Sequence, residues 1–339
     1  MDYKIVDKFK TNKWIIIFAV ISLSLSVCMG FLSQLGLILL PLVVALTSIV
    51  YFLEDGRFPT VSVVLSVLII VVDLVLNGVY SYCCLASVVI SLVIYFFARY
   101  KLLSKGETAL LLTIILAIFI GLMILFAAFH DVGSFDIAAA QEYLNGIVAE
   151  AKTTFITSFE EAMAELPTQP DPDVSELINS ETLAAMFDSY VNLFISVVVV
   201  FAFLFVGLSY KAFTFVFSKL VEDKSALRSF RFELSPIFAY FYMALYLLGF
   251  FFGGKDIISI SVLNLLNVFT FIFAYLGFVF VNSILQARFS NKLVATILLI
   301  VGVIMLYQFA ISILSIAGAF SMIILARARQ VGNGNGNDN

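Results

Sequence analysis

The chain has 339 residues, of which 62% are hydrophobic and 12% charged, and its formal net charge is −4. Soluble globular domains carry about a quarter charged residues, so this composition excludes a soluble protein and predicts an all-α polytopic integral membrane protein. A sequence pI near 5.1, without a basic domain, argues against nucleic acid as a partner.

Long apolar segments follow one another along the chain. A transmembrane helix needs about 20 mainly apolar residues, and this criterion predicts a bundle of nine or ten helices in the lipid bilayer. The segments are residues 14–33, 36–53, 59–79, 82–98, 108–129, 188–210, 236–252, 258–285 and 293–326. The last would be about 51 Å long as one helix, too long for an ordinary crossing, so we expect two short helices that meet near Tyr307 and Gln308.

The first segment carries small residues at four-residue spacing, namely Ser22, Ser26 and Gly30. Such a stripe allows two helices to approach closely. Two interpretations stay open: packing within the same bundle, or docking onto another membrane subunit.

The basic residues indicate how the chain is oriented. Lys and Arg are retained in short cytoplasmic loops, and all of the 19 except Lys152 and Lys255 fall on one side of the predicted helices. Both termini are therefore predicted to be cytoplasmic. The chain divides into membrane helices in 1–129, an acidic extracytoplasmic insert at 130–187, membrane helices in 188–326, and a flexible Gly/Asn tail at 327–339.

The insert is predicted to contain an amphipathic helix, because apolar residues recur in it at three- and four-residue spacing. They are Ile137, Leu144, Ile147, Val148, Ala151, Phe155, Phe159, Ala162 and Leu166. Pro167, Pro170 and Pro172 should end this helix, and a shorter one should restart with Asp173 or Ser180 as N-cap. The insert is interpreted either as a lid over the outer rim of the bundle or as a solvated loop.

Few polar residues occur inside the predicted segments, and such residues mark either binding sites or helix contacts. They gather toward the predicted outer side from four segments, which favours an outward-facing ligand pocket. The candidate ligand-binding residues are Asp73, Asn77, Asp188, Asn192, Asn264, Asn267 and Gln308. Asp73 has a second interpretation as a helix-packing residue, and each Asn has one as an interhelical contact.

The chemistry of a catalytic or metal site is missing from the sequence. A single histidine, His130, argues against a histidine metal cluster and against a Ser-His-Asp triad. We therefore expect no enzyme activity, no metal and no cofactor. In the aromatic run at 238–252, Tyr240 and Tyr246 are possible polar handles for a flat ligand, although lipid contact also explains the run.

The second half of the chain resembles a known family. The stretches "GLSYKAF", "SPIFAYFYMALYLLGFFF", "LNLLNVFTFIFAYLGFVFVNSIL" and "ILSIAGAFSMIILARAR" resemble the YybS-like family of bacterial predicted membrane proteins. Gly318 and Arg327 fit the family's final helix, whereas Phe320 and Ser321 occupy its Asp region. The resemblance implies a bacterial cell membrane protein.

That family is in turn similar to the substrate-binding (S) subunits of energy-coupling factor transporters. The similarity implies an outward-facing pocket for a vitamin-like molecule or a metal, and docking through the first helix to a coupling membrane subunit with paired ATPases. It would give Ser22, Ser26 and Gly30 the docking role. The alternative function is a membrane scaffold or regulator whose external insert binds an envelope partner.

Overall fold

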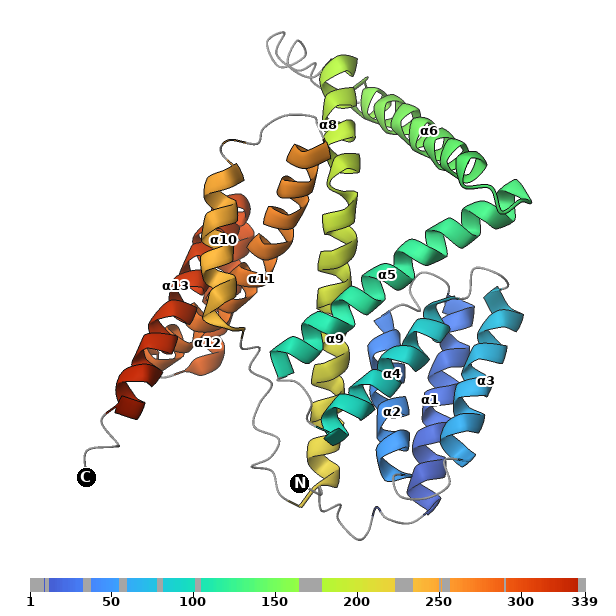
Figure 1. The fold of residues 1–339 in the computed structure, drawn as a ribbon, viewed down its shortest axis with the longest axis vertical. Helices are drawn as coiled ribbons and strands as arrows, with labels where there is room; N and C mark the ends of the chain where they lie inside the picture. The colour runs from blue at the N-terminus through green and yellow to red at the C-terminus, as the bar shows by residue number, and fades with distance from the viewer. Residues whose placement is uncertain are drawn as a thin grey trace. The chain divides into compact units, whose positions relative to one another are not determined.

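The computed structural model describes residues 9, 12–32, 38–54, 60–77, 82–100, 105–164, 179–222, 234–249, 251, 257–289 and 291–334 (Figure 1). Most of these residues lie in helices. They are α1 (Asn12–Leu32), α2 (Leu40–Leu53), α3 (Thr60–Asn77), α4 (Tyr82–Tyr100), α5 (Lys105–Val132), α6 (Ile137–Ala164), α8 (Ser180–Asn192), α9 (Phe194–Leu220), α10 (Pro236–Gly249), α11 (Ile257–Arg288), α12 (Lys292–Met305) and α13 (Tyr307–Gly334).

Every predicted apolar segment contains a helix, which confirms the all-helical class. In the described part of the chain, four helices are long and apolar enough to cross a membrane: α1, α5, α9 and α11. Six further apolar helical stretches are 10–17 residues long, in α2, α3, α4, α10, α12 and α13. The nine or ten crossings therefore stay a prediction, whereas the apolar helices themselves are observed.

The helix boundaries differ from the predicted ones in α9 and at the end of α13, whereas the predicted division of the last segment is observed. The segment predicted at 188–210 is broken at Leu193, and α9 continues to Leu220. The long segment at 293–326 is divided as expected, because α12 ends at Met305 and α13 begins at Tyr307. Finally, α13 runs to Gly334, so the first part of the predicted tail is helical.

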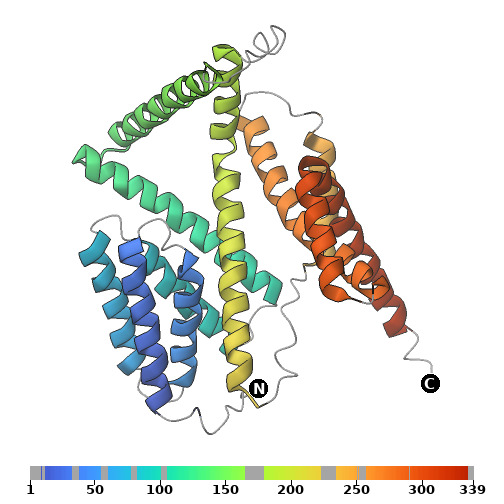
Figure 2. The same cartoon turned by 180° about the vertical axis from the view of Figure 1, so that it is seen from behind.

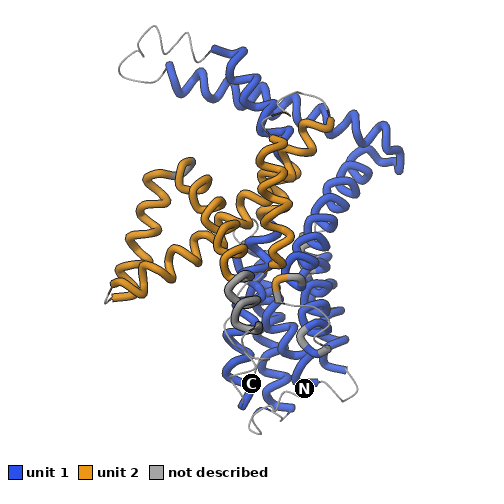
Figure 3. Tube along the Cα trace, turned by 60° about the vertical axis from the view of Figure 1, so that its left-hand side comes forward, with its two compact units in different colours: residues 1–103, 108–194, 202–230 blue, residues 104–107, 195–201, 231–339 orange. Residues whose placement is uncertain are grey.

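The chain forms two compact units (Figure 3). Unit 1 comprises residues 1–103, 108–194 and 202–230, and unit 2 comprises residues 104–107, 195–201 and 231–339.

In unit 1, helices α1 to α4 lie side by side around α2 (Figures 1 and 2). α2 is buried along almost its whole length. Small hydroxyl side chains let its neighbours approach closely: Ser22 of α1 hydrogen bonds to Thr47 of α2 (Oγ to Oγ1, 2.8 Å), and Ser91 of α4 donates to the carbonyl of Val44 (3.1 Å).

Aromatic rings join α2 to α9 in the same unit. Phe52 lies 4.7 Å from Phe217 between ring centroids, and Phe213 stacks on Phe217 at 5.2 Å. Both rings of α9 are fully buried. Such pairs contribute about 0.5–1.5 kcal/mol each beyond their buried area. These ring contacts therefore hold the C-terminal half of α9, which is predicted to lie toward the cytoplasm, against α2.

Glu54 forms the buried connection between α2 and α3. Its carboxylate accepts hydrogen bonds from the backbone N–H of Val61 (2.8 Å) and of Ser62 (2.7 Å), and from the Ser62 hydroxyl. The first N–H groups of a helix have no partner within it, and a negative charge there is stabilised by the helix dipole. Glu54 therefore caps α3 from outside the helix.

A close glycine contact holds α11 to α13 in unit 2. A Cβ atom added at Gly277 would lie 1.8 Å from the carbonyl oxygen of Leu314, and one added at Gly318 would lie 2.0 Å from that of Phe273. The two backbones therefore touch at this crossing, and only glycine fits at either position.

The predicted insert contains two helices of unit 1, α6 and α8. α5 ends at Val132, and the next residue, Gly133, has a φ of 72° and donates its N–H to Phe129 O (3.0 Å), which forms a left-handed C-cap. Asp136 then caps α6 by accepting from the N–H of Ala138 (2.9 Å). α8 begins at Ser180, with Asn179 as N-cap rather than Asp173 or Ser180. The three prolines lie outside the described residues.

Candidate functional site

The predicted site residues divide between the two units. Asp73 and Asn77 belong to α3, and Gln308 belongs to α13. The side chains of these three residues, and the surroundings of Gly30, lie outside the described part of the structure. The convergence of all seven residues in one pocket therefore stays a prediction.

Asn264 and Asn267 of α11 both bind Ser196, near the start of α9 in unit 2. The Oδ1 atom of Asn264 accepts from the backbone N–H of Ser196 (2.9 Å), and Asn267 Nδ2 donates to the Ser196 hydroxyl (2.9 Å). The N-cap residue of α9, Leu193, makes no capping bond with its side chain. Asn264 therefore supplies an N-terminal cap from another helix, which explains why an amide is placed in this apolar segment.

A second polar group lies farther along α11. The hydroxyl of Tyr242, a fully buried residue of α10, donates to Ser315 Oγ of α13 (2.9 Å) and lies 3.3 Å from Thr270 Oγ1. The sequence suggested Tyr240 and Tyr246 as polar handles. Tyr240 is more than half exposed, whereas Tyr242 shares the buried face of α10 with Ala239 and Leu245. The three-residue spacing of Ala239, Tyr242 and Leu245 is the sequence pattern that could have identified Tyr242 as the buried tyrosine of this helix.

We call these residues the polar cluster: Ser196, Tyr242, Asn264, Asn267, Thr270 and Ser315. Its side chains carry amide and hydroxyl groups without charge, so the cluster can recognise a ligand through hydrogen bonds. The amide of Asn264 is engaged at both ends, because Nδ2 also donates to Ile260 O (3.0 Å). In the described part of the chain, Asn267 Oδ1 accepts no hydrogen bond, so the cluster leaves this acceptor available.

Asp188 and Asn192 lie in α8, before the membrane-length helix α9 begins. Asp188 is exposed, and both of its carboxylate oxygens accept from Lys152 Nζ of α6 at 2.8 Å. Exposed ion pairs contribute little to stability, about 0–1 kcal/mol. This pair ties the two helices of the insert together, beside the ring contact of Phe155 with Phe187 at 5.7 Å.

Ser22 and Ser26 face the interior of unit 1. Both side chains are buried, and Ser22 hydrogen bonds to Thr47 of α2. This environment agrees with the packing interpretation of the small-residue stripe. The docking interpretation requires α2 to move away from α1.

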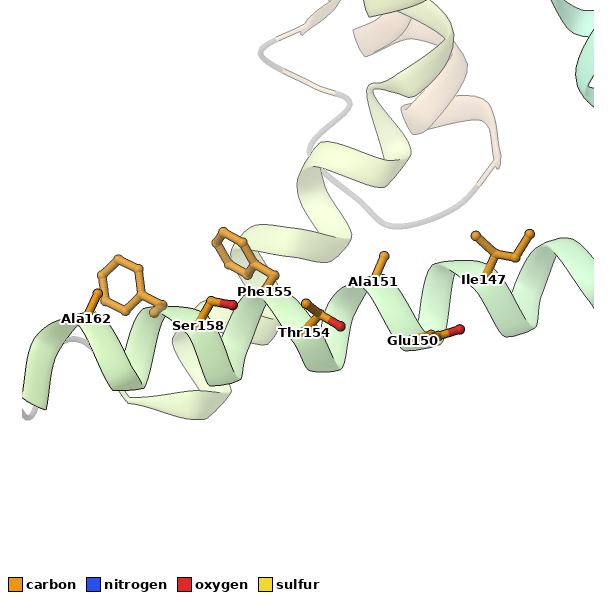
Figure 4. A pocket seen from close by; sticks show the side chains of 8 residues that line it. Ile147, Glu150, Ala151, Thr154, Phe155, Ser158 and Ala162 are labelled. Atoms are coloured by element: carbon orange, nitrogen blue, oxygen red, sulfur yellow. The ribbon is translucent and has the colours of Figure 1, made fainter. Parts of the chain in front are cut away.

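An apolar hollow of about 730 Å³ lies along one side of α6 (Figure 4). All of its lining residues belong to that helix: Ile147, Glu150, Ala151, Thr154, Phe155, Ser158, Phe159 and Ala162. Among the described residues, no three His, Cys, Asp or Glu side chains are grouped so as to hold a metal ion.

Comparison with known proteins identifies the family of the chain. The curated proteins and the solved structures contain no match. The model of the family described as "predicted membrane protein (DUF2232)" matches residues 16–322. The match extends over most of the chain and confirms the family that the resemblance had indicated. The protein therefore belongs to this family of predicted membrane proteins.

Proposed function

We propose that the protein is the substrate-binding subunit of a small-molecule uptake system in the bacterial cell membrane, and that it has no enzymatic activity of its own. Such a subunit captures a ligand within a helical bundle, and a separate complex supplies the energy for transport. This function would make the protein similar to the S subunits of energy-coupling factor transporters.

The observation that supports this proposal best is the polar cluster. Polar side chains in apolar helices are costly and therefore concentrate where function or helix contact requires them. The bonds of Asn264 and Tyr242 account for helix contacts. Asn267 is the exception, because its amide uses its donor on Ser196 and leaves its acceptor available.

The chemistry of the cluster favours a vitamin-like organic ligand over a metal ion. Protein metal sites usually include a carboxylate, thiolate or imidazole ligand, and the polar cluster contains none of these groups. A hydrogen-bonding ligand would donate to Asn267 Oδ1. Asp73 of α3 is proposed separately as a residue that binds a cationic group, since a carboxylate in a membrane segment is costly without a partner.

The proposed partner is a coupling membrane subunit with paired ATPases. A motif for ATP binding is missing from this sequence, so energy for transport would have to come from such a complex. Docking through Ser22, Ser26 and Gly30 would require α1 to exchange its contact with α2 for a contact with that subunit.

Affinity purification of the tagged protein in mild detergent, with mass spectrometry of the bound proteins, tests this proposal. Recovery of a membrane subunit together with two ATPases is the expected result. A reproducible envelope protein in place of these subunits would contradict it. Asn267→Ala should abolish ligand binding, and unchanged binding would exclude this residue from the site.

A second candidate function is a membrane scaffold or regulator whose insert binds an envelope partner. The observation in its favour is the exposed acidic side of α6, with Glu142, Glu160 and Glu161. On this alternative, charge reversal of these residues would abolish partner binding. The transport function would tolerate the same change.

A further inference from the structure

We propose that α6 is an interfacial helix whose free apolar side lies against lipid acyl chains, at the membrane boundary where α5 ends and α9 begins. The inference does not depend on the proposed uptake function. It places α6 beside the membrane helices, in place of the lid over their ends that the sequence suggested.

The apolar side of α6 is only partly covered by protein. Phe155 and Phe159 are half-buried, and Phe155 contacts Phe187 of α8. The rest of this side forms the open hollow, in which Ile147 is 45% exposed (Figure 4). Glu142 and Glu160 lie on the opposite side of the helix, whereas Glu150 borders the hollow. An apolar side opposite a charged one is the pattern of helices that lie in a membrane interface.

The first end of α6 is held at the end of a membrane-length helix. α5 has 28 residues and is about 42 Å long, which exceeds the roughly 30 Å of hydrocarbon, so its last turns reach the boundary. The tight corner at Gly133 follows at once, and the Tyr143 hydroxyl donates to Asp131 of α5 (2.8 Å). α6 therefore cannot begin far from the membrane surface.

Apolar surface continues from α5 around this corner onto α6. The rings of Phe126, Phe129 and Phe135 follow one another at centroid distances of 6.4 and 5.5 Å. Phe135 is 86% exposed and Ile137 is 70% exposed. Since α5 has the length and apolar composition of a membrane helix, lipid is the occupant that this continuous surface fits.

The middle of α6 is held at a similar level by α8. Lys152 and Phe155 contact Asp188 and Phe187, which precede the first residue of α9 by six and seven residues, or about 9–10 Å along the helix axis. The headgroup layer on each side of the hydrocarbon is about 5–8 Å thick. The attachments to α5 and α8 therefore hold α6 at the outer edge of this layer.

The charge of α6 distinguishes it from interfacial helices that depend on anionic lipids. Its side chains include four glutamates, Glu142, Glu150, Glu160 and Glu161, and one lysine, Lys152. Attraction to lipid must therefore come from the apolar side, and a neutral phosphatidylcholine membrane should be sufficient.

The test compares two positions on opposite sides of α6 in the full-length chain. A nitrobenzoxadiazole dye is attached to Ala151→Cys or to Thr153→Cys, in a chain whose native cysteines are replaced by alanine, in phosphatidylcholine nanodiscs. The dye at 151 should be quenched several-fold more by spin-labelled lipid than by iodide, and the dye at 153 should show the reverse. Addition of anionic lipid should leave both ratios unchanged.

Two outcomes would overturn the proposal. Equal iodide quenching at 151 and 153 would place the apolar side in water. Protection of 151 from both quenchers would mean that protein covers it, as a lid over the bundle or through a partner. A photoactivatable phosphatidylcholine applied to the unmodified chain gives an independent reading: it should label Ile147 and Val148, and failure to label either residue would also contradict the placement.

Discussion

Replacement of Gly277 by alanine tests how closely α11 and α13 pack. The new Cβ would lie 1.8 Å from Leu314 O and 2.7 Å from its carbonyl carbon, whereas ordinary contacts begin near 3.4 Å. The helices must therefore separate locally by about 1.6 Å, and a gap of about 0.5–1 Å already removes a quarter to a half of a dispersion contact. Because the obstacle is backbone, we expect a loss near the upper end of the overpacking range, about 3 kcal/mol.

The free energy of unfolding, measured by denaturant titration in mild detergent with circular dichroism, gives this loss. Gly302→Ala in α12 is the matched control, since a Cβ there has no atom within 4 Å, and it should leave stability unchanged or raise it by up to about 1 kcal/mol. Gly318→Ala should cost as much as Gly277→Ala, and the double variant less than the sum, because one separation relieves both clashes. Equal stability of the Gly277→Ala and Gly302→Ala proteins would refute the close contact.

Three further results are expected. Glu54→Ala should lower the free energy of unfolding by about 2–3 kcal/mol, because it leaves the first N–H groups of α3 without an acceptor. Glu54→Gln should lower it by less. Equal losses in the two variants would show that the carboxylate does not cap the helix. Asn264→Ala should lower the free energy of unfolding by about 1–2 kcal/mol, because it removes the cap of α9. Hydrogen exchange at the start of α9 should increase in this variant, and unchanged exchange would place the cap elsewhere. The hydrogen bond to Asp131 raises the pKa of Tyr143 above 10.0. The contribution of this contact to stability is therefore fully present below about pH 10 and is lost as the pH rises through the folded-state pKa. An ultraviolet titration in which Tyr143→Phe and wild type differ only below pH 10 would contradict this shift.

Hydrophobic patterning predicted most of the helices, because each apolar run must form a helix to satisfy its backbone in lipid. It also predicted the division of the last segment, where length alone excludes a single crossing. The break at Leu193 was not predicted, since residues on both sides of it are apolar. That break is stabilised by Asn264, a residue remote in the sequence, and a hydropathy window does not detect such a partner.

The sequence also predicted part of the candidate site. The sequence singled out Asn264 and Asn267 because amides are rare in apolar helices, but it did not indicate Ser196, which both of them bind. Serines are common in these segments, and their role depends on which helix lies opposite. The capping role of Glu54 was missed, because a carboxylate at the end of an apolar segment is interpreted as a loop residue unless its three-dimensional contacts are known.

Retention of a small molecule by the purified protein tests the proposed binding function most directly. The wild type, Asn267→Ala and the control Gly302→Ala are purified in the same detergent, and mass spectrometry identifies the small molecules released on denaturation. The account predicts one organic compound, with a hydrogen-bond donor, that is retained by the wild type and the control and lost from Asn267→Ala. Equal retention by all three proteins, or no retained compound in any of them, would contradict it.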